Sequence, residues 1–183
     1  MRIISGKARG TKLETLSGTS TRPTLERVKE SVFNIIQQEV TDCIFLDLFA
    51  GSGSIGIEAA SRGAKEVIMC EKDKDAFNII RKNIEKTHLE KIIKVYKMDF
   101  ESMLSTKLDK KVDIIYIDPP YKTNYALKTV EILLEKELLK DNSKIIIETD
   151  REEEIIEQIE KLDVKIIDKR KYGRAHIIFL AKV

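Results

Sequence analysis

The stretch Phe45-Leu46-Asp47-Leu48-Phe49-Ala50-Gly51-Ser52-Gly53-Ser54-Ile55-Gly56 decides the fold of this 183-residue chain. An apolar strand over residues 43–48 leads into glycines spaced G-x-G-x-x-G, and a helix over residues 54–62 follows. Glycines allow a tight turn and let a ligand approach the backbone where a Cβ would clash. This pattern between a strand and a helix is typical of the nucleotide-binding loop of α/β folds.

Strands and helices continue to alternate after this loop. The pattern predicts further strands over residues 66–71, 92–97, 112–117, 144–149, 163–169 and 175–182. It predicts further helices over residues 73–87, 101–106, 124–139 and 151–161. Such alternation indicates a mostly parallel sheet with helices on both faces. The last two strands are separated only by residues 170–174, which favours an antiparallel hairpin over a crossover.

The first forty residues follow a different pattern. Residues 2–16 alternate loosely around two glycines and predict a small β-hairpin appendage, and a polar connector runs to residue 23. Thr24 is expected to be the N-cap of a helix over residues 25–40. The chain length suits a single domain over 1–183, in which 1–23 form the basic hairpin and connector and 24–183 the Rossmann-like core.

Charge is unevenly distributed, although the formal net charge is only +2. Residues 1–23 carry five basic side chains against one acidic, and residues 161–183 carry seven against two. Basic ends suit a polyanion such as nucleic acid, but charge alone favours an ordinary solvated surface in a lysine-rich sequence. The chain has no apolar run that could span a membrane and no signal-peptide core, so we expect a cytoplasmic protein. We also expect the protein to be a monomer.

Side chains that can bind a nucleoside follow the first three strands. Glu71 ends the second strand and can accept hydrogen bonds from two ribose hydroxyls. Asp47 precedes the glycine loop, where an acid suits a ligand with a cationic amino-acid end better than a pyrophosphate. Asp99 can accept from an adenine amino group with Phe100 packed on the ring, although Asp99 is equally suited to cap the helix that follows. These residues favour S-adenosylmethionine over NAD.

The most informative tetrapeptide is Asp118-Pro119-Pro120-Tyr121, directly after the fourth strand. Two prolines fix φ and remove two N–H donors, so the loop is rigid and presents acceptors. Asp118 and the carbonyl of Pro119 can hold both hydrogens of an exocyclic amine, and Tyr121 can stack on its ring. Holding the hydrogens favours a pyramidal nitrogen whose lone pair can attack a methyl sulfonium in line.

Together with the glycine loop, these residues make the sequence resemble the amino-methylating class I methyltransferases. The stretches 4–13 and 21–35 and the tripeptide Lys171-Tyr172-Gly173 are similar to one family within that class, the bacterial 16S ribosomal RNA guanine-N2 methyltransferases. The resemblance covers nearly the whole chain. It implies a Rossmann-like, seven-stranded, mostly parallel sheet with the last strand antiparallel.

The resemblance also implies roles for particular residues. S-adenosylmethionine would be held by Asp47, Phe49, Gly51, Gly53, Glu71, Lys72, Asp99, Phe100 and Thr24. Ribosomal RNA, free or in an assembling small subunit, would be contacted by Lys7, Arg9, Lys12, Arg22, Arg27, Lys29 and Tyr172. Tyr172 is suited to stack on a base, but equally to pack a hairpin. The catalytic loop would be Asp118, Pro119, Pro120 and Tyr121. No metal site is evident, because Cys43 and Cys70 read as core thiols without histidines nearby.

Other functions share part of this pattern. A DNA adenine-N6 methyltransferase would use the same catalytic loop, but usually needs extra sequence to recognise its site. A protein glutamine methyltransferase typically has Asn at the position of Asp118. An NAD-dependent oxidoreductase would share the glycine loop and Glu71 but has no use for Asp-Pro-Pro-Tyr. A non-catalytic RNA-binding module would leave the cofactor residues unexplained.

Overall fold

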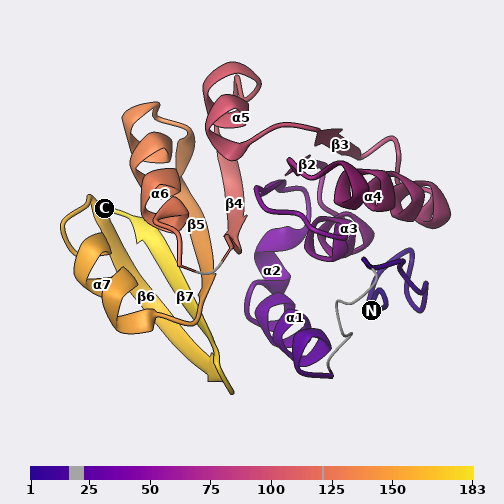
Figure 1. The fold of residues 1–183 in the computed structure, drawn as a ribbon, viewed down its shortest axis with the longest axis horizontal. Coiled ribbons are helices and arrows are strands. Elements are labelled where there is room, and N and C mark those ends of the chain that lie inside the picture. The colour runs from indigo at the N-terminus through magenta and orange to yellow at the C-terminus, as the bar shows by residue number, and fades with distance from the viewer. Residues whose placement is uncertain (17–22, 121) are drawn as a thin grey trace.

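The computed structural model describes residues 1–16, 23–120 and 122–183. They form one seven-stranded sheet with helices on both faces (Figure 1). Its strands are β1 Ile44–Asp47, β2 Glu66–Cys70, β3 Ile93–Tyr96, β4 Val112–Ile117, β5 Leu139–Thr149, β6 Val164–Tyr172 and β7 Ala175–Lys182. The helices are α1 Pro23–Ile35, α2 Gln37–Val40, α3 Ser54–Ser61, α4 Lys74–Thr87, α5 Phe100–Thr106, α6 Tyr125–Glu135 and α7 Glu152–Ile159. In these ranges no helix has the length and apolar character needed to cross a membrane.

The strand order is β3-β2-β1-β4-β5-β7-β6. The first five strands pair in parallel, whereas β7 runs antiparallel to both β5 and β6. The predicted Rossmann-like sheet and its closing antiparallel hairpin are therefore confirmed. The order reverses between β1 and β4, and ligands of such sheets bind at the carboxyl ends of the strands beside this switch.

Each face of the sheet has its own apolar cluster. In one cluster, the helices α1, α2, α3 and α4 pack against strand side chains such as Phe45 and Tyr116. In the other, the helices α5, α6 and α7 pack against strand side chains such as Leu46 and Ile115. Neighbouring residues of a strand point to opposite faces, so a strand covered on both sides needs apolar residues throughout. Each fully buried Ile or Phe contributes roughly 1.5–3 kcal/mol.

The N-terminal segment, residues 1–16, differs from the expected appendage. Its two arms are hydrogen-bonded, but the only β-bridge within it joins Arg2 to Lys12, so no hairpin strands form. Ile3, Ala8 and Leu13 are buried and belong to the same apolar cluster as α1 and α3. The segment is therefore a part of the core with a basic outer side.

Two predicted helices end in different places. The helix expected over residues 25–40 breaks at Ile36 into α1 and α2. Because α1 already begins at Pro23, the expectation that Thr24 is its N-cap was wrong; proline suits the first helical position, where an N–H is not needed. The helix expected over 124–139 ends at Glu135, because Glu137 takes the left-handed conformation (φ 52°). The N–H of Glu137 donates to the carbonyl of Leu134, and the N–H of Leu138 donates to that of Leu133, which closes the helix.

Candidate functional site

A cavity of about 450 Å³ opens at the carboxyl ends of β1 to β4. Its volume falls within the range of small-ligand sites, about 300–1,000 Å³. The cavity gathers residues that the sequence placed after four different strands: Phe49, Gly51, Glu71, Lys72, Asp99, Phe100, Asp118, Pro119 and Pro120. Tyr121 lies outside the described residues. The arrangement is the one expected where parallel strands end at a switch in strand order.

Glu71 fastens the glycine loop to the end of β2. The N–H of Gly51 donates to Glu71 Oε2 at 2.9 Å, and the N–H of Asp73 donates to Oε1 at 2.8 Å. Gly51 and Gly53 both have positive φ (56° and 78°), a conformation that disfavours side chains. Each carboxylate oxygen still has a lone pair, so Glu71 can hold the loop and accept from a ligand at the same time.

Asp47 is buried at the start of the loop, with a side chain that is 2% exposed. Its Oδ2 accepts the N–H of Gly56 at 3.1 Å, and among the described residues no lysine or arginine pairs with it. Burial, with a smaller contribution from the charge of Glu71, raises the pKa of Asp47 to about 7. A buried carboxylate without a cationic partner suits the ammonium end of a ligand.

Asp99 caps α5, as one of the two readings of the sequence predicted. Its Oδ1 accepts the N–H of Ser102 at 2.9 Å, and its Oδ2 accepts the Ser102 hydroxyl at 2.7 Å. These hydrogen bonds lower the pKa of Asp99, which keeps the carboxylate ionised. Asp99 also lines the cavity, so capping and contact with a ligand are compatible.

Three aromatic rings form one wall of the cavity. Phe49 and Tyr125 lie nearly parallel at 7°, with centroids 6.2 Å apart, and Phe100 packs against both at 5.2 and 5.0 Å. The Lys72 ammonium lies 5.9 Å from the centre of the Tyr125 ring. Sequence reasoning missed Tyr125, whose only signal is its place as the first residue of the helix after the proline loop.

Hydrogen bonds from Thr123 and Arg151 hold the backbone of the proline loop in place. The Thr123 hydroxyl donates to the carbonyl of Pro120 at 2.8 Å, and Arg151 Nη2 donates to the carbonyl of Thr123 at 2.8 Å. Arg151 also pairs with Glu154 in the first turn of α7. Sequence reasoning missed Thr123 and Arg151, because their partners are backbone carbonyls of a loop that only the fold brings near α7.

A second cavity, of about 280 Å³, adjoins the first and shares Phe49, Gly51 and Asp118 with it. Its wall includes Asp47, Glu148 and the N-terminal segment. Asp118 is solvent-exposed where it faces this cavity. The surrounding protein atoms reduce the hydration of its carboxyl group and raise its pKa well above the usual range, and the charges of Glu148 and Asp47 raise the pKa further.

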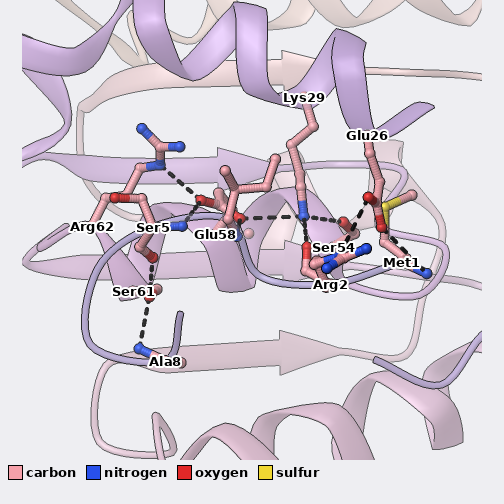
Figure 2. Close-up of polar contacts among 12 residues, drawn as sticks. Met1, Arg2, Ser5, Ala8, Glu26, Lys29, Ser54, Glu58, Ser61 and Arg62 are labelled. Carbon is pink, nitrogen blue, oxygen red and sulfur yellow. Dashed lines mark hydrogen bonds and ion pairs between the residues drawn. The ribbon is translucent and has the colours of Figure 1, made fainter. Parts of the chain in front are cut away.

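A buried polar network attaches the N-terminal segment to α1 and α3 (Figure 2). Glu58 of α3 is fully buried and accepts the N–H groups of Ile4 at 2.8 Å and Ser5 at 3.0 Å. The same carboxylate pairs with Arg62 at 2.8 Å and with Lys29 at 3.2 Å. Four donors thus satisfy one buried acid, as burial of a charge requires.

Lys29 corrects one sequence-based prediction. The side chain is 1% exposed, and its ammonium donates to the carbonyl of Arg2 at 2.6 Å and to the Ser54 hydroxyl at 3.0 Å (Figure 2). Burial lowers the pKa of Lys29, and pairing with Glu58 opposes that shift. With its ammonium bound inside the protein, Lys29 is not placed to contact RNA phosphates; it joins α1 to the first residue of α3.

The other predicted RNA contacts differ in their surroundings. Lys7, Arg9, Lys12 and Arg27 are exposed, whereas Arg22 and the side chain of Thr24 lie outside the described residues. Tyr172 is partly buried against the apolar cluster, and its hydroxyl is hydrogen-bonded to Ser31 of α1. Tyr172 therefore packs the β6–β7 hairpin onto α1, the alternative to stacking on a base.

Comparison with known proteins places this chain among methyltransferases. The family model described as conserved hypothetical protein 95 matches residues 1–181. "Putative rRNA methyltransferase YlbH" of Bacillus subtilis is 36% identical over 100% of this chain and 99% of its own length. "Ribosomal RNA small subunit methyltransferase D" of Haemophilus influenzae is 36% identical over 85% of this chain and 82% of its own.

Solved structures agree with the fold. "Putative methyltransferase yhhF" from Escherichia coli superposes with a TM-score of 0.83 at 27% identity, covering 100% of this chain and 97% of its own. A methylase structure from Haemophilus influenzae gives 0.80 at 29% identity, covering 100% and 98%. The class I methyltransferase fold expected from the resemblance is therefore confirmed.

Proposed function

This chain belongs to the family of conserved hypothetical protein 95, and from that membership we propose that it transfers a methyl group from S-adenosylmethionine to ribosomal RNA. The acceptor that we propose is the exocyclic N2 amine of a guanine in the small-subunit RNA. The names of its relatives support the RNA class. The observation that carries the reaction type is the Asp118-Pro119-Pro120 loop in the wall of the cofactor-sized cavity.

The residues of the cavity fit this cofactor. We assign the ribose hydroxyls to Glu71, the cationic amino group to Asp47, and the adenine to Asp99 and Phe100. The buried carboxylate of Asp47 favours this ligand over NAD, whose pyrophosphate would face an acid at the glycine loop. When bound, S-adenosylmethionine supplies a methyl group on a positively charged sulfur.

The proline loop would prepare the nucleophile. Asp118 and the carbonyl of Pro119 would accept the two hydrogens of the amine, so that its lone pair is freed from the ring and aimed along one line. Thr123 and Arg151 hold this loop in place from behind. Asp118, or a water molecule beside it, would then take the proton that the nitrogen releases.

The exposed basic side of the N-terminal segment is the proposed RNA surface. Lys7, Arg9 and Lys12 point their charges outward, and Arg27 on α1 is exposed as well. Met1 and Leu16 of the same segment line the second cavity, so this surface reaches the edge of the cleft. RNA held there through its phosphates would bring a base to Asp118.

A methyl-transfer assay with labelled S-adenosylmethionine tests this function. Small-subunit particles lacking the modification and naked ribosomal RNA are the two acceptors, and calorimetric titrations with S-adenosylmethionine and NAD accompany the assay. We expect binding of S-adenosylmethionine, none of NAD, and label in RNA; comparison of the acceptors shows which form is used. Binding of NAD, or cofactor binding without transfer to either acceptor, would contradict the proposal.

A further inference from the structure

Glu148 lies one residue before the end of β5, beside the catalytic loop. The parallel pairing of β4 with β5 sets Ile117 opposite Ile147, so Asp118 and Glu148 take the next positions along the edge. Side chains alternate along a strand, so Tyr116, Asp118 and Glu148 project from the same face of the sheet. The second cavity is lined by all three.

Among the described residues, the carboxylate of Glu148 is held by a single donor. The buried hydroxyl of Tyr116 donates to Glu148 Oε2 at 2.5 Å, and no lysine or arginine of the described ranges pairs with the acid. Its Oε1 therefore has lone pairs to offer to a donor inside the cavity. Burial raises the pKa of Glu148, so a hydrogen bond from a ligand would compensate for lost solvation.

The strand order places Glu148 on the substrate side of the cleft. The residues assigned to the cofactor follow β3, β2 and β1, and Asp118 follows β4. Glu148 on β5 comes next, on the side of Asp118 that faces away from the cofactor residues. If Asp118 holds the amine, the ring that carries this amine extends toward Glu148.

Guanine offers two kinds of donor on the edge that would face these acids. Its N2 amine lies beside its N1–H on the Watson–Crick edge, so two neighbouring carboxylates can take one donor each. We propose that Glu148 accepts the N1–H of the target guanine while Asp118 holds the N2 amine, which makes Glu148 the residue that selects guanine. This inference rests on the proposed guanine-N2 activity.

The same geometry rejects other bases. Adenine carries a lone pair at N1, which would face the oxygens of Glu148, and a buried polar group left unpaired is costly. A site built around an N–H donor discriminates strongly against analogues that lack it. Tyr116 acts as a positioning residue, because its hydroxyl fixes the carboxylate without reaching the base.

Substitution of the target base tests the assignment. Once product analysis has located the methylated guanine, RNA is prepared with guanine or with 2-aminopurine at that position; 2-aminopurine keeps the 2-amine but has a lone pair at N1. We expect the wild type to prefer guanine in kcat/KM by at least about tenfold. Glu148→Gln, whose amide can donate to that lone pair, should reduce this preference by about tenfold or more.

Tyr116→Phe is the matched control, because it removes the partner of Glu148 but keeps the carboxylate. Because the carboxylate remains but loses the donor that positions it, Tyr116→Phe should keep a preference for guanine with a lower kcat/KM, whereas Glu148→Gln should lose the preference; both variants should bind S-adenosylmethionine as the wild type does. Equal use of the two bases by the wild type, or a preference unchanged in Glu148→Gln, would overturn the role of Glu148. Absence of methyl transfer to the guanine RNA by the wild type would instead overturn the proposed function itself.

Discussion

The cleft and the N-terminal segment lie side by side but are built in different ways. The cleft is made of short loops, each directly after a strand, and each loop could be identified from a stretch of a few residues in the sequence. The N-terminal segment is held by Glu58, which binds the N–H groups of Ile4 and Ser5 from more than fifty positions away. Chemistry set by local sequence can be predicted, whereas packing set by one distant buried acid cannot.

The largest effect should come from removing that acid. Glu58→Ala would leave Lys29 buried without its partner and free two N–H groups, so we expect a loss of about 3–5 kcal/mol in the free energy of unfolding. Chemical denaturation measures it. Lys29→Met combined with Glu58→Leu should recover part of the loss, because the Lys29 ammonium is then no longer buried without its acid, while Arg62 still loses its partner. If Glu58→Ala alone unfolds like the wild type, the network does not hold the segment.

In the cleft, the substitution that corresponds to Glu58→Ala in the N-terminal segment is Asp118→Ala. In the proposed arrangement Asp118 holds the amine of the substrate, so turnover should fall by about 10²–10³ or more while the dissociation constant of S-adenosylmethionine changes little. Single-turnover methyl transfer and calorimetry separate the two quantities. Unchanged turnover with intact cofactor binding would remove Asp118 from its role.

Glu71→Ala should have the opposite signature. It removes charge-assisted hydrogen bonds to the ribose and to the glycine loop, so cofactor binding should weaken by roughly 1–3 kcal/mol. Calorimetric titration gives the dissociation constant, and Asp75→Ala, which removes an exposed acid at the start of α4 outside the cavity lining, is the control. A dissociation constant equal to that of the wild type would exclude Glu71 from the site.

The outer side of the N-terminal segment can be tested apart from its inner side. Reversing Lys7, Arg9 and Lys12 to Glu should weaken RNA binding by about tenfold or more and flatten its dependence on salt. Cofactor affinity and unfolding should stay unchanged, because these side chains are exposed. Filter binding over a series of salt concentrations measures the slope; an unaltered slope would place the RNA elsewhere.

The smallest effect concerns pH. The pKa of Asp47 is raised to about 7, so the carboxylate gains charge as pH rises through neutrality. An ionised Asp47 attracts the ammonium of the cofactor, so affinity should rise by less than about tenfold between pH 6 and 7.5. Asp47→Asn should abolish this rise. Affinity that falls over the same range would contradict the assignment.

Much of the fold followed from the sequence because its signals are local. Short apolar runs alternating with segments of helical spacing predicted the strands, and the short link over 170–174 predicted the antiparallel hairpin. The proline loop and Glu71 were found because parallel strands deliver their following residues to one edge. The break at Ile36 was missed, since the apolar spacing of the helix continues through it.

The residues whose place was wrongly predicted or missed have no local signal. Lys29 was predicted to contact RNA because it looks like any basic residue of an exposed helix face, and only Glu58 and Ser54, brought together by the fold, show that it is buried. Tyr125 and Glu148 line the two cavities only because α6 and β5 carry them there. Such roles depend on which elements become neighbours, and periodicity along the chain does not contain that information.

The identity of the methylated nucleoside tests the central claim most directly. Small-subunit particles, naked ribosomal RNA and DNA are incubated in parallel with labelled S-adenosylmethionine and the wild type, and each product is digested to nucleosides. We predict label in RNA as N2-methylguanosine. Label in DNA as N6-methyladenine would keep the proposed roles of Asp118 and its loop but contradict the RNA substrate, the guanine and the role assigned to Glu148.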